Sequence, residues 1–203
     1  MMTMNKRNLQ KQRIMRFFID AAKEIIKTEG IKNITARRVG ETAGYSYATI
    51  YNYFKDMNTL LTYCAFDFLE DCYEHVITFK DDKWDCKEQL IIYNIEFFKY
   101  FAENPEIFKL VYLEDLGKIP EELSKRPSIS RLILDNLNES SKKGYLQKNS
   151  IDLLLELMGA SIHGKLLFYL NRPNENQDLD FVLQVIEKEI EFLLNNNEVK
   201  NYE

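Results

Sequence analysis

The sequence predicts an all-α protein with an N-terminal three-helix domain and a larger C-terminal helical domain. Only seven glycines and four prolines occur among its 203 residues. No segment alternates apolar and polar residues as a half-buried strand would. Apolar residues recur instead at three- and four-residue intervals, the period of one face of an α-helix. With 45% hydrophobic residues, the chain can bury a substantial core.

A long amphipathic pattern begins the first domain. Apolar residues recur from Ile14 to Ile26 at i, i+3, i+4 and i+7, and Gly30 suits the end of that helix. Residues 1–13 are polar and basic, without the apolar run of a signal peptide. No stretch of about 18 uninterrupted apolar residues follows, as a membrane span would need. We therefore expect a cytoplasmic protein that begins with a basic arm and makes no membrane contact.

Two short helices follow, joined by a glycine. The first is expected over residues 36–43 with Thr35 as its N-cap, and the second over residues 47–53 with Ser46 as its N-cap. Gly44 lies between them, where a tight turn needs the positive φ that costs glycine little. This arrangement predicts a helix-turn-helix.

The interior of that motif is small. Val39, Ala43 and Ile50 are expected to form its core. Gly40 lies where the two helices cross, so that a side chain larger than a methyl group would push them apart. Phe54 is expected in the core, whereas Tyr51 could be either a core or a contact residue.

Six further helical patterns fill the rest of the chain. The fifth helix of the chain is apolar nearly all round, which is typical of a central, buried helix. Asp56 suits the N-cap of the fourth helix. Residues 117–127 and 171–174 are expected to be connections, and the tail 195–203 to be frayed. The expected helices cover residues 57–78, 85–102, 106–115, 128–143, 150–170 and 178–195.

The charge of the chain is unevenly distributed, although the formal net charge is only −5. Residues 1–55 carry eleven Lys/Arg and four Asp/Glu, a net charge of +7. Residues 56–203 carry 16 Lys/Arg and 28 Asp/Glu, a net charge of −12. A basic end on an acidic body indicates that only the first part of the chain meets a polyanion such as a nucleic acid.

The helix-turn-helix also resembles a known family. The run Ala43-Gly-x-Ser-x-x-Thr-Ile-Tyr-x-x-Phe54 is similar to the DNA-binding domain of the TetR (AcrR) family, and the resemblance covers about residues 13–62. It implies a DNA-binding domain over residues 1–55 and a helical ligand-binding and dimerisation domain over residues 56–203. Two positions depart from the family pattern, because Met57 stands where a lysine is usual and Gly40 where an alanine is usual.

The resemblance also implies roles for single residues. Arg37 and Tyr47 match positions that reach base edges, and Ala48 matches a position where a small residue allows close approach to the groove. Phosphate contacts are implied for Thr35, Thr49, Tyr51, Tyr53 and Lys55. Ser46 and Asn52 complete the candidate DNA-binding residues. Arg38 could be a solvated helix residue or a contact, and the basic arm could be solvated or could touch phosphates or the minor groove.

The sequence carries few signals for catalysis, cofactor binding or metal binding. The sequence contains no GxSxG, HExxH, P-loop or GxGxxG motif, so we expect no enzyme and no cofactor. Cys64, Cys72 and Cys86 form no CxxC pair and are expected to be free thiols. Cys64 and Cys72 lie about 12 Å apart along one helix, too far to share an ion, so we expect no metal site.

The C-terminal domain offers a dimer interface and an effector pocket. The last helix has an apolar stripe that includes Phe181 and Ile190, and the one before it places small residues at Ala160 and Gly164. Two such helices from each chain would form a four-helix homodimer interface, although part of these stripes must face the protomer's own core.

Aromatic residues mark the candidate pocket. They either line a cavity for a largely apolar or aromatic effector or only fill a large core. The acids Glu96 and Glu114 could be polar residues of such a pocket, but exposed helix faces explain them more simply. The candidate effector-binding residues are Phe66, Tyr93, Phe97, Tyr100, Tyr112 and His163.

These patterns predict a ligand-responsive regulator. As a homodimer it would bind a palindromic double-stranded DNA operator as a repressor, and a small-molecule effector would release it. The alternative is a helical interaction or adaptor protein that uses the helix-turn-helix for packing only. The net charge of +7 on residues 1–55 favours the regulator, because a packing motif does not need it.

Overall fold

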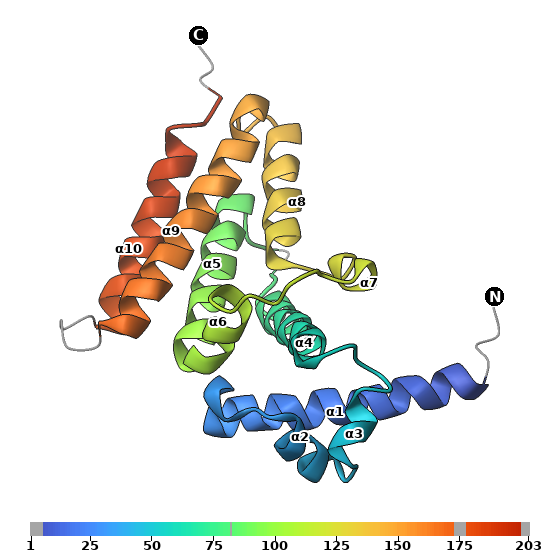
Figure 1. Cartoon of the computed structure of the whole chain (residues 1–203). Coiled ribbons are helices and arrows are strands. Elements are labelled where there is room, and N and C mark those ends of the chain that lie inside the picture. The colour runs from blue at the N-terminus through green and yellow to red at the C-terminus, as the bar shows by residue number, and fades with distance from the viewer. Residues whose placement is uncertain (1–5, 82, 173–177, 200–203) are drawn as a thin grey trace. The chain divides into compact units, whose positions relative to one another are not determined.

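A computed structural model describes residues 6–81, 83–172 and 178–199 of the chain (Figure 1). Its residues divide into two compact units, each built from two segments of the chain. The head unit comprises Met1–Leu69 and Asn104–Arg126, and the body unit comprises Glu70–Glu103 and Pro127–Glu203. The helix α4 (Met57–Ile77) contributes its first part to the head unit and its last part to the body unit. The predicted functional boundary after residue 55 stays a prediction.

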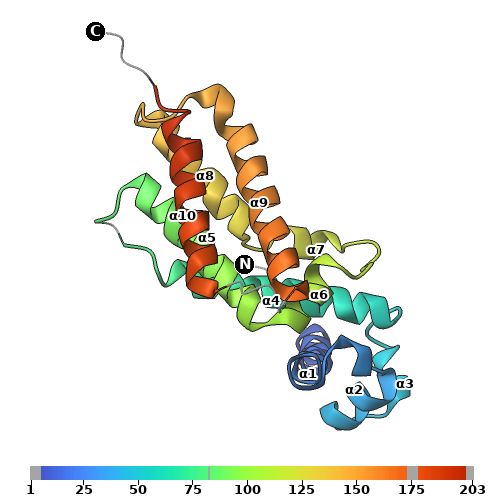
Figure 2. The same ribbon diagram turned by 90° about the vertical axis from the view of Figure 1, so that its left-hand side faces the viewer.

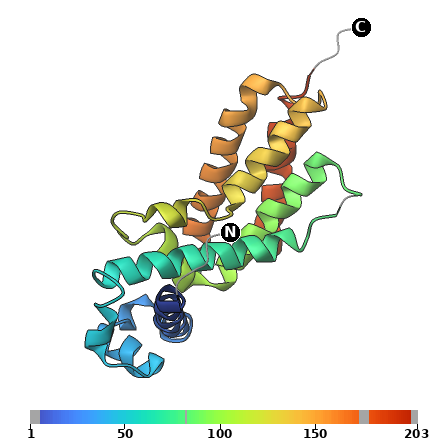
Figure 3. The same cartoon turned by 90° about the vertical axis from the view of Figure 1, so that its right-hand side faces the viewer.

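The head unit is organised around one long helix, α1, and Figures 2 and 3 view this helix nearly along its axis, with α2 and α3 on one side. Phe18 of α1 is fully buried, and its ring packs 5.3 Å from that of Tyr45 and 6.5 Å from that of Phe54. Besides the start of α4, the unit contains α1 (Lys6–Glu29), η1 (Ile31–Asn33), α2 (Ala36–Ala43), α3 (Tyr47–Ile50), α6 (Pro105–Tyr112) and α7 (Glu121–Ser124).

A buried carboxylate joins α1 to α4 within the head unit. Asp67 of α4 accepts a hydrogen bond of 2.7 Å from Arg16 Nη1 and another from Lys23 Nζ, both on α1. Arg126 Nη1 lies 3.5 Å from the same carboxylate. Burial opposes the ionisation of Asp67, but the hydrogen bonds and charges of Lys23 and Arg16 outweigh it, so its pKa lies below the ordinary value. The carboxylate is therefore held charged between the two helices.

A second carboxylate joins α6 to the end of α1. Glu106 Oε2 accepts a hydrogen bond of 3.0 Å from the backbone N–H of Ile31, and Glu106 Oε1 accepts one of 2.5 Å from Lys109. Gly30 precedes that N–H with φ of +84°, a conformation that side chains rarely adopt. A Cβ atom at Gly30 would lie only 2.8 Å from Glu106 Oε2. The glycine therefore leaves room for the carboxylate as well as for the turn.

The body unit packs long helices around α5 (Cys86–Glu103), which lies against α8 (Ile129–Lys142), α9 (Ile151–Asn171) and α10 (Leu179–Asn195) (Figures 1 and 2). Leu90, Phe98 and Phe101 of α5 are fully buried. The 3₁₀ helix η2 (Lys148–Ser150) leads into α9. An isolated β-bridge between Leu146 and Glu198 joins the segment after α8 to the segment after α10.

The predicted all-α architecture is confirmed, and the two predicted caps at Thr35 and Asp56 form. Thr35 Oγ1 accepts the N–H of Arg38 at 3.2 Å, and Asp56 Oδ1 accepts the N–H of Thr59 at 2.8 Å. Ser46 stands at the predicted N-cap position of α3, but its side chain makes no capping bond. The predicted connection over 171–174 and the predicted frayed tail fall partly on residues 173–177 and 200–203, outside the described residues. For the described part of the tail the prediction is wrong, because the carbonyl of Asn197 accepts the N–H of Gln147 and the N–H of Val199 donates to the carbonyl of Tyr145.

Several helix bounds differ from the prediction, and α6 ends at Tyr112 instead of residue 115. The first helix begins at Lys6, eight residues before the apolar pattern does. The predicted loop 117–127 contains the short helix α7. The helix α3 ends at Ile50, and turns continue to Tyr53, because Tyr53 N–H and Phe54 N–H both bond to the carbonyl of Ile50.

One helical stretch, Lys148–Asn171, is long and apolar enough to cross a membrane by length and composition. A single helix of this kind is weak evidence for a membrane span. Only 22% of its apolar window is buried inside the described chain, so much of this apolar surface is exposed.

Candidate nucleic-acid interface

The turn between α2 and α3 is held by its backbone. Gly44 adopts a left-handed conformation with φ of 75° and ψ of 26°, as the sequence predicts for this position. The N–H of Tyr45 donates a hydrogen bond of 2.9 Å to the carbonyl of Gly40. Val39 and Ile50 are fully buried beneath the turn, and Ala43 is half-buried. The two short helices therefore form one closely packed unit.

Gly40 sets how closely the two helices approach. A Cβ atom at this position would lie 2.9 Å from the carbonyl oxygen of Tyr45 and 3.0 Å from the nitrogen of Tyr47. Both are backbone atoms, which cannot move aside as a flexible side chain can. The expectation that a methyl group would fit here is therefore wrong, since even one methyl group is too large.

Most of the predicted DNA-binding side chains point outward. Arg37 has 83% of its side chain exposed and Tyr47 is 60% exposed, so neither contributes to the core of the head unit. The predicted core residue Phe54 is buried, whereas Tyr51 is exposed. Of the ten candidates, Thr49 and Tyr53 are half-buried, and the exposed ones are Thr35, Arg37, Ser46, Tyr47, Ala48, Tyr51, Asn52 and Lys55.

Local contacts orient several of these side chains. Arg37 Nε donates to Glu41 Oε1 at 2.9 Å, one turn further along α2. Arg38 Nη2 lies 2.5 Å from Glu29 Oε1 and so ties α2 to the end of α1. The Arg37 ion pair is highly exposed, so little free energy opposes its exchange for another anion. Arg37 is therefore the more available of the two guanidinium groups.

The candidate effector-binding residues divide between the two units. Phe66 is half-buried and Tyr112 exposed, both in the head unit, whereas the other four belong to the body unit. Tyr93 and Phe97 are buried, and the ring of Phe97 lies 5.6 Å from that of His163 in an edge-on contact. Of the four candidates in the body unit, Phe97 and His163 are therefore in direct ring contact.

The sequence does not indicate that Glu96 is buried. Glu96 is only 4% exposed, so the prediction that it lies on an exposed face is wrong. Its Oε1 pairs with Lys99 Nζ at 2.7 Å, and its Oε2 lies 3.2 Å from His75 Nε2. The ring of Tyr100 lies 6.0 Å from that of His75. No pattern in the sequence indicates this pairing, because His75 and Glu96 stand 21 residues apart.

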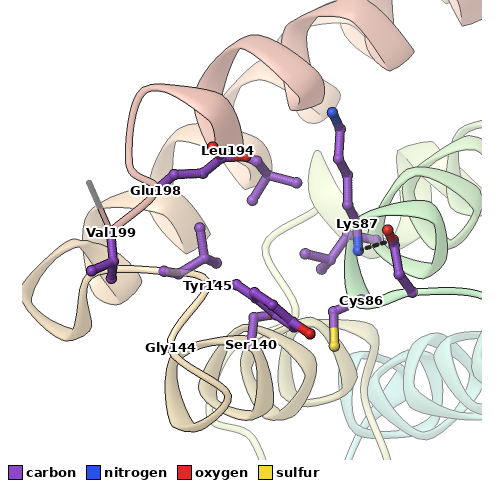
Figure 4. A pocket seen from close by; sticks show the side chains of 11 residues that line it. Cys86, Lys87, Ser140, Gly144, Tyr145, Leu194, Glu198 and Val199 are labelled. Atoms are coloured by element: carbon purple, nitrogen blue, oxygen red, sulfur yellow. Dashed lines mark hydrogen bonds between the residues drawn. The ribbon is translucent and has the colours of Figure 1, made fainter. Parts of the chain in front are cut away.

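A cavity of about 450 Å³ lies in the body unit (Figure 4). It lies among the start of α5, the end of α8 and the segment after α10, and Cys86, Ser140 and Tyr145 contribute to its wall. None of the predicted effector-binding residues lines it. In the head unit, a second cavity of about 920 Å³ is lined by Lys55 and by residues 116–121.

The other two thiols are inaccessible. Cys64 and Cys72 are fully buried. Burial raises the pKa of the Cys64 thiol well above its ordinary value and raises that of Cys72 to about 12. Both thiols therefore stay protonated at neutral pH, as inert core residues do.

Comparisons with known proteins agree with this geometry. Residues 18–64 match the family model described as bacterial regulatory proteins of the tetR family. A TetR-family transcriptional regulator from Mesorhizobium loti is 17% identical, with a TM-score of 0.71 over 94% of this chain and 99% of that chain. No curated protein sequence matches the chain.

Two further solved structures share the fold. The fatty acid degradation regulator FadR from Bacillus halodurans is 20% identical, with a TM-score of 0.68 over 87% of this chain and 93% of that chain. The regulator RolR, solved in complex with resorcinol, is 15% identical, with a TM-score of 0.70 over 96% of this chain and 100% of that chain. At these identities the likeness shows a common fold.

A helix-turn-helix with outward-facing side chains is the fold of a DNA-binding domain. The match over residues 18–64 and the shared fold make the assignment more specific. Residues 18–64 match the family model of bacterial regulatory proteins of the tetR family, and the whole chain shares the fold of solved TetR-family regulators.

Proposed function

We propose that the chain is a homodimeric, cytoplasmic repressor that leaves its DNA operator when a small molecule binds. The observation that carries the proposal is the exposure of the side chains on α2 and α3. Tyr47 and Tyr51 are large aromatic residues that a packing-only motif would bury, yet they are 60% and 49% exposed. This argues against the alternative of an adaptor protein.

In this proposal α3 enters the major groove. Tyr47 and Arg37 contact base edges, Ala48 allows close approach, and Ser46 and Asn52 flank them. The remaining candidates hold the phosphate backbone, which fixes the register of the protein without reading sequence. They are Thr35, Thr49, Tyr51, Tyr53 and Lys55.

Selection from a random double-stranded DNA library tests the proposal. The protein should enrich a pseudo-palindromic sequence, since a two-fold dimer presents two identical heads. Arg37→Ala should weaken binding to that sequence by about 1–3 kcal/mol and relax the preference at one base pair per half-site. Lys55→Ala should weaken binding to all sequences alike. If the protein enriches no sequence, or does not bind DNA at low salt, the proposal that it is a DNA-binding regulator is wrong.

An apolar surface supports the homodimer. Leu153 and Leu157 of α9 are 60% and 43% exposed, and Phe168 is 51% exposed. At about 100° per residue, these three share one face of α9 with the small residues Ala160 and Gly164. Such a face, with room at its centre for a second helix, suits close packing against a copy of itself.

The last helix extends this surface. Val182, Ile186 and Ile190 of α10 are buried within the protomer, whereas Phe181 and Phe192 are 63% and 66% exposed. We therefore propose that the exposed faces of α9 and α10, with Leu153, Leu157 and Phe168, form the four-helix interface.

Sedimentation velocity tests the dimer. Leu157→Arg should convert the protein from dimer to monomer at micromolar concentration, because it places a charge in the centre of the interface. Leu113→Arg, at another exposed leucine outside this face, is the control and should leave the dimer intact. A wild-type protein that sediments as a monomer would contradict the proposal.

The proposed effector is a small apolar or aromatic molecule. RolR, which shares the fold, was solved with the aromatic ligand resorcinol. In the body unit, Tyr93, Phe97, Tyr100 and His163 offer aromatic faces with a few polar groups, which suit such a ligand. Because Tyr93 and Phe97 are buried and Phe97 contacts the ring of His163, a ligand must displace side chains to enter.

A thermal-shift screen with phenols and other small aromatic compounds tests this assignment. A ligand that binds only the native state raises the melting temperature and should also weaken operator binding. Phe97→Ala and His163→Ala should blunt that response while ligand-free DNA binding persists. An unchanged response in both variants would show that the effector binds elsewhere.

A further inference from the structure

The first turns of α1 contribute no buried side chain to the head unit. Residues 6–13 are all exposed, and the first buried residue of the helix is Phe18. At 1.5 Å per residue, these eight residues add about 12 Å of helix. Figure 1 shows this dark blue end of α1 extending past α2 and α3. We call residues 6–13 the α1 extension.

The α1 extension is strongly basic. It carries Lys6, Arg7, Lys11 and Arg13, and the sequence has no acidic residue before Asp20. Side chains on a helix pair at spacings of three and four residues, so no acid on α1 is within reach of Lys6, Lys11 or Arg13. Further along, Arg16 differs, because it pairs with Asp20 and Asp67, and Asp67 ties it to α4.

The arrangement of these charges indicates the kind of partner. At about 100° per residue, Lys6 and Arg13 share one side of the helix, whereas Lys11 points to another. Leu9 is the only apolar residue of the extension, so the helix has no apolar face for a membrane surface or for a protein groove. Cations on several sides without an apolar anchor suit the phosphates of a nucleic acid backbone.

We propose that the α1 extension is a second DNA-binding element, which holds phosphates outside the base pairs that α3 reads. The proposal rests on the proposed operator binding and adds to it a basic surface that the helix-turn-helix lacks. Lys6, Lys11 and Arg13 carry the contact. Because phosphates carry no base information, the extension increases affinity and salt dependence but leaves sequence preference unchanged.

The test compares two triple variants of equal charge. K6Q/K11Q/R13Q removes three cations from the extension, and glutamine keeps the helix because its propensity is similar to that of lysine and arginine. Arg7 has a further interaction and is left unchanged. The control K125Q/R131Q/K142Q removes three exposed cations elsewhere. Operator affinity is measured for each from 50 to 300 mM salt, with hydroxyl-radical footprints of the bound DNA.

Each phosphate contact contributes about 0.9 to the slope of log affinity against log salt. Because each of the two protomers loses three contacts, the slope should fall by about 5 in K6Q/K11Q/R13Q and by much less in the control, and the footprint should lose its outer edges. The charge-preserving K6R/K11R should behave as wild type. If the salt slope and the footprint of K6Q/K11Q/R13Q are unchanged while Lys55→Ala still weakens binding, the proposed role of the α1 extension is wrong but the proposed operator binding stands. Wild-type protein that binds no DNA would overturn both proposals.

Discussion

Replacing Gly40 by alanine tests the geometry of the helix-turn-helix most directly. The new Cβ atom would lie 2.9, 3.0 and 3.1 Å from three backbone atoms of Tyr45 and Tyr47. Ordinary contacts begin at 3.4 Å, so the start of α3 must move by several tenths of an ångström relative to α2. The movement also strains the hydrogen bond from the N–H of Tyr45 to the carbonyl of Gly40.

Two opposing effects set the magnitude. Alanine favours the helix over glycine by about 1 kcal/mol, whereas overpacking a close contact costs about 1–3 kcal/mol. We therefore expect Gly40→Ala to lower the free energy of unfolding by about 1 kcal/mol. Operator affinity should fall further, because α3 carries Tyr47 and loses its alignment with the bases, at about 1–3 kcal/mol per lost base contact.

Urea denaturation and operator titration measure the two quantities. Gly159→Ala is the matched control, since this glycine is also helical but a Cβ atom there would meet nothing within 4 Å. It should stabilise the protein slightly and leave DNA binding unchanged. If Gly40→Ala were more stable than wild type and bound the operator equally well, the crossing of α2 and α3 would not be limited by this contact.

Three further predictions concern the stability of the head unit. Asp67→Asn should lower the free energy of unfolding by about 3–5 kcal/mol in urea denaturation, because it removes the carboxylate that Lys23 contacts in the buried interior. The control Asp20→Asn removes an exposed partner of Arg16 and should cost less than about 1 kcal/mol. Folding lowers the pKa of Asp67, so the stability that this carboxylate contributes is complete above the unfolded pKa of about 3.9 and is lost as the pH falls through the folded pKa. The difference in the free energy of unfolding between wild type and Asp67→Asn should therefore disappear below about pH 4. A difference that does not change with pH would contradict the lowered pKa. Gly30→Ala should destabilise the protein by more than Gly144→Ala. Gly144 also has a positive φ, of +80°, but its Cβ position is open, so alanine there should cost about 1–2 kcal/mol. Equal losses of stability in thermal denaturation would mean that Glu106 moves aside freely.

Local features of the fold were predictable from the sequence. The caps at Thr35 and Asp56 and the left-handed Gly44 follow from chemistry within three or four residues, and each is present. Ser46 shows the limit of such reasoning. It stands at the cap position of α3, but its hydroxyl lies 2.8 Å from that of Thr49 instead of capping the helix.

Features that depend on distant residues were not predictable. Asp67 meets Lys23 and Arg16 across 44 and 51 residues, and nothing in one sequence links such positions. The helical start at Lys6 was missed for a different reason. Residues 6–13 lack the apolar period that marks a buried helix face, although lysine, arginine and glutamine are good helix formers. The outward direction of the α2 and α3 side chains follows from the motif. The effector-binding prediction rests on the i, i+4, i+7 spacing of Tyr93, Phe97 and Tyr100, which does not distinguish the wall of a cavity from a filled core.

The head unit is not a continuous stretch of the chain. Its first 69 residues are joined by residues 104–126, which supply Glu106 to the backbone of Ile31 and Arg126 to the carboxylate of Asp67. During synthesis, α1 to α3 therefore leave the ribosome long before their last partners do. A fragment that ends after α3 would lack these contacts and the whole of α4, so the DNA-binding helices reach their full stability only when the chain has been made to residue 126.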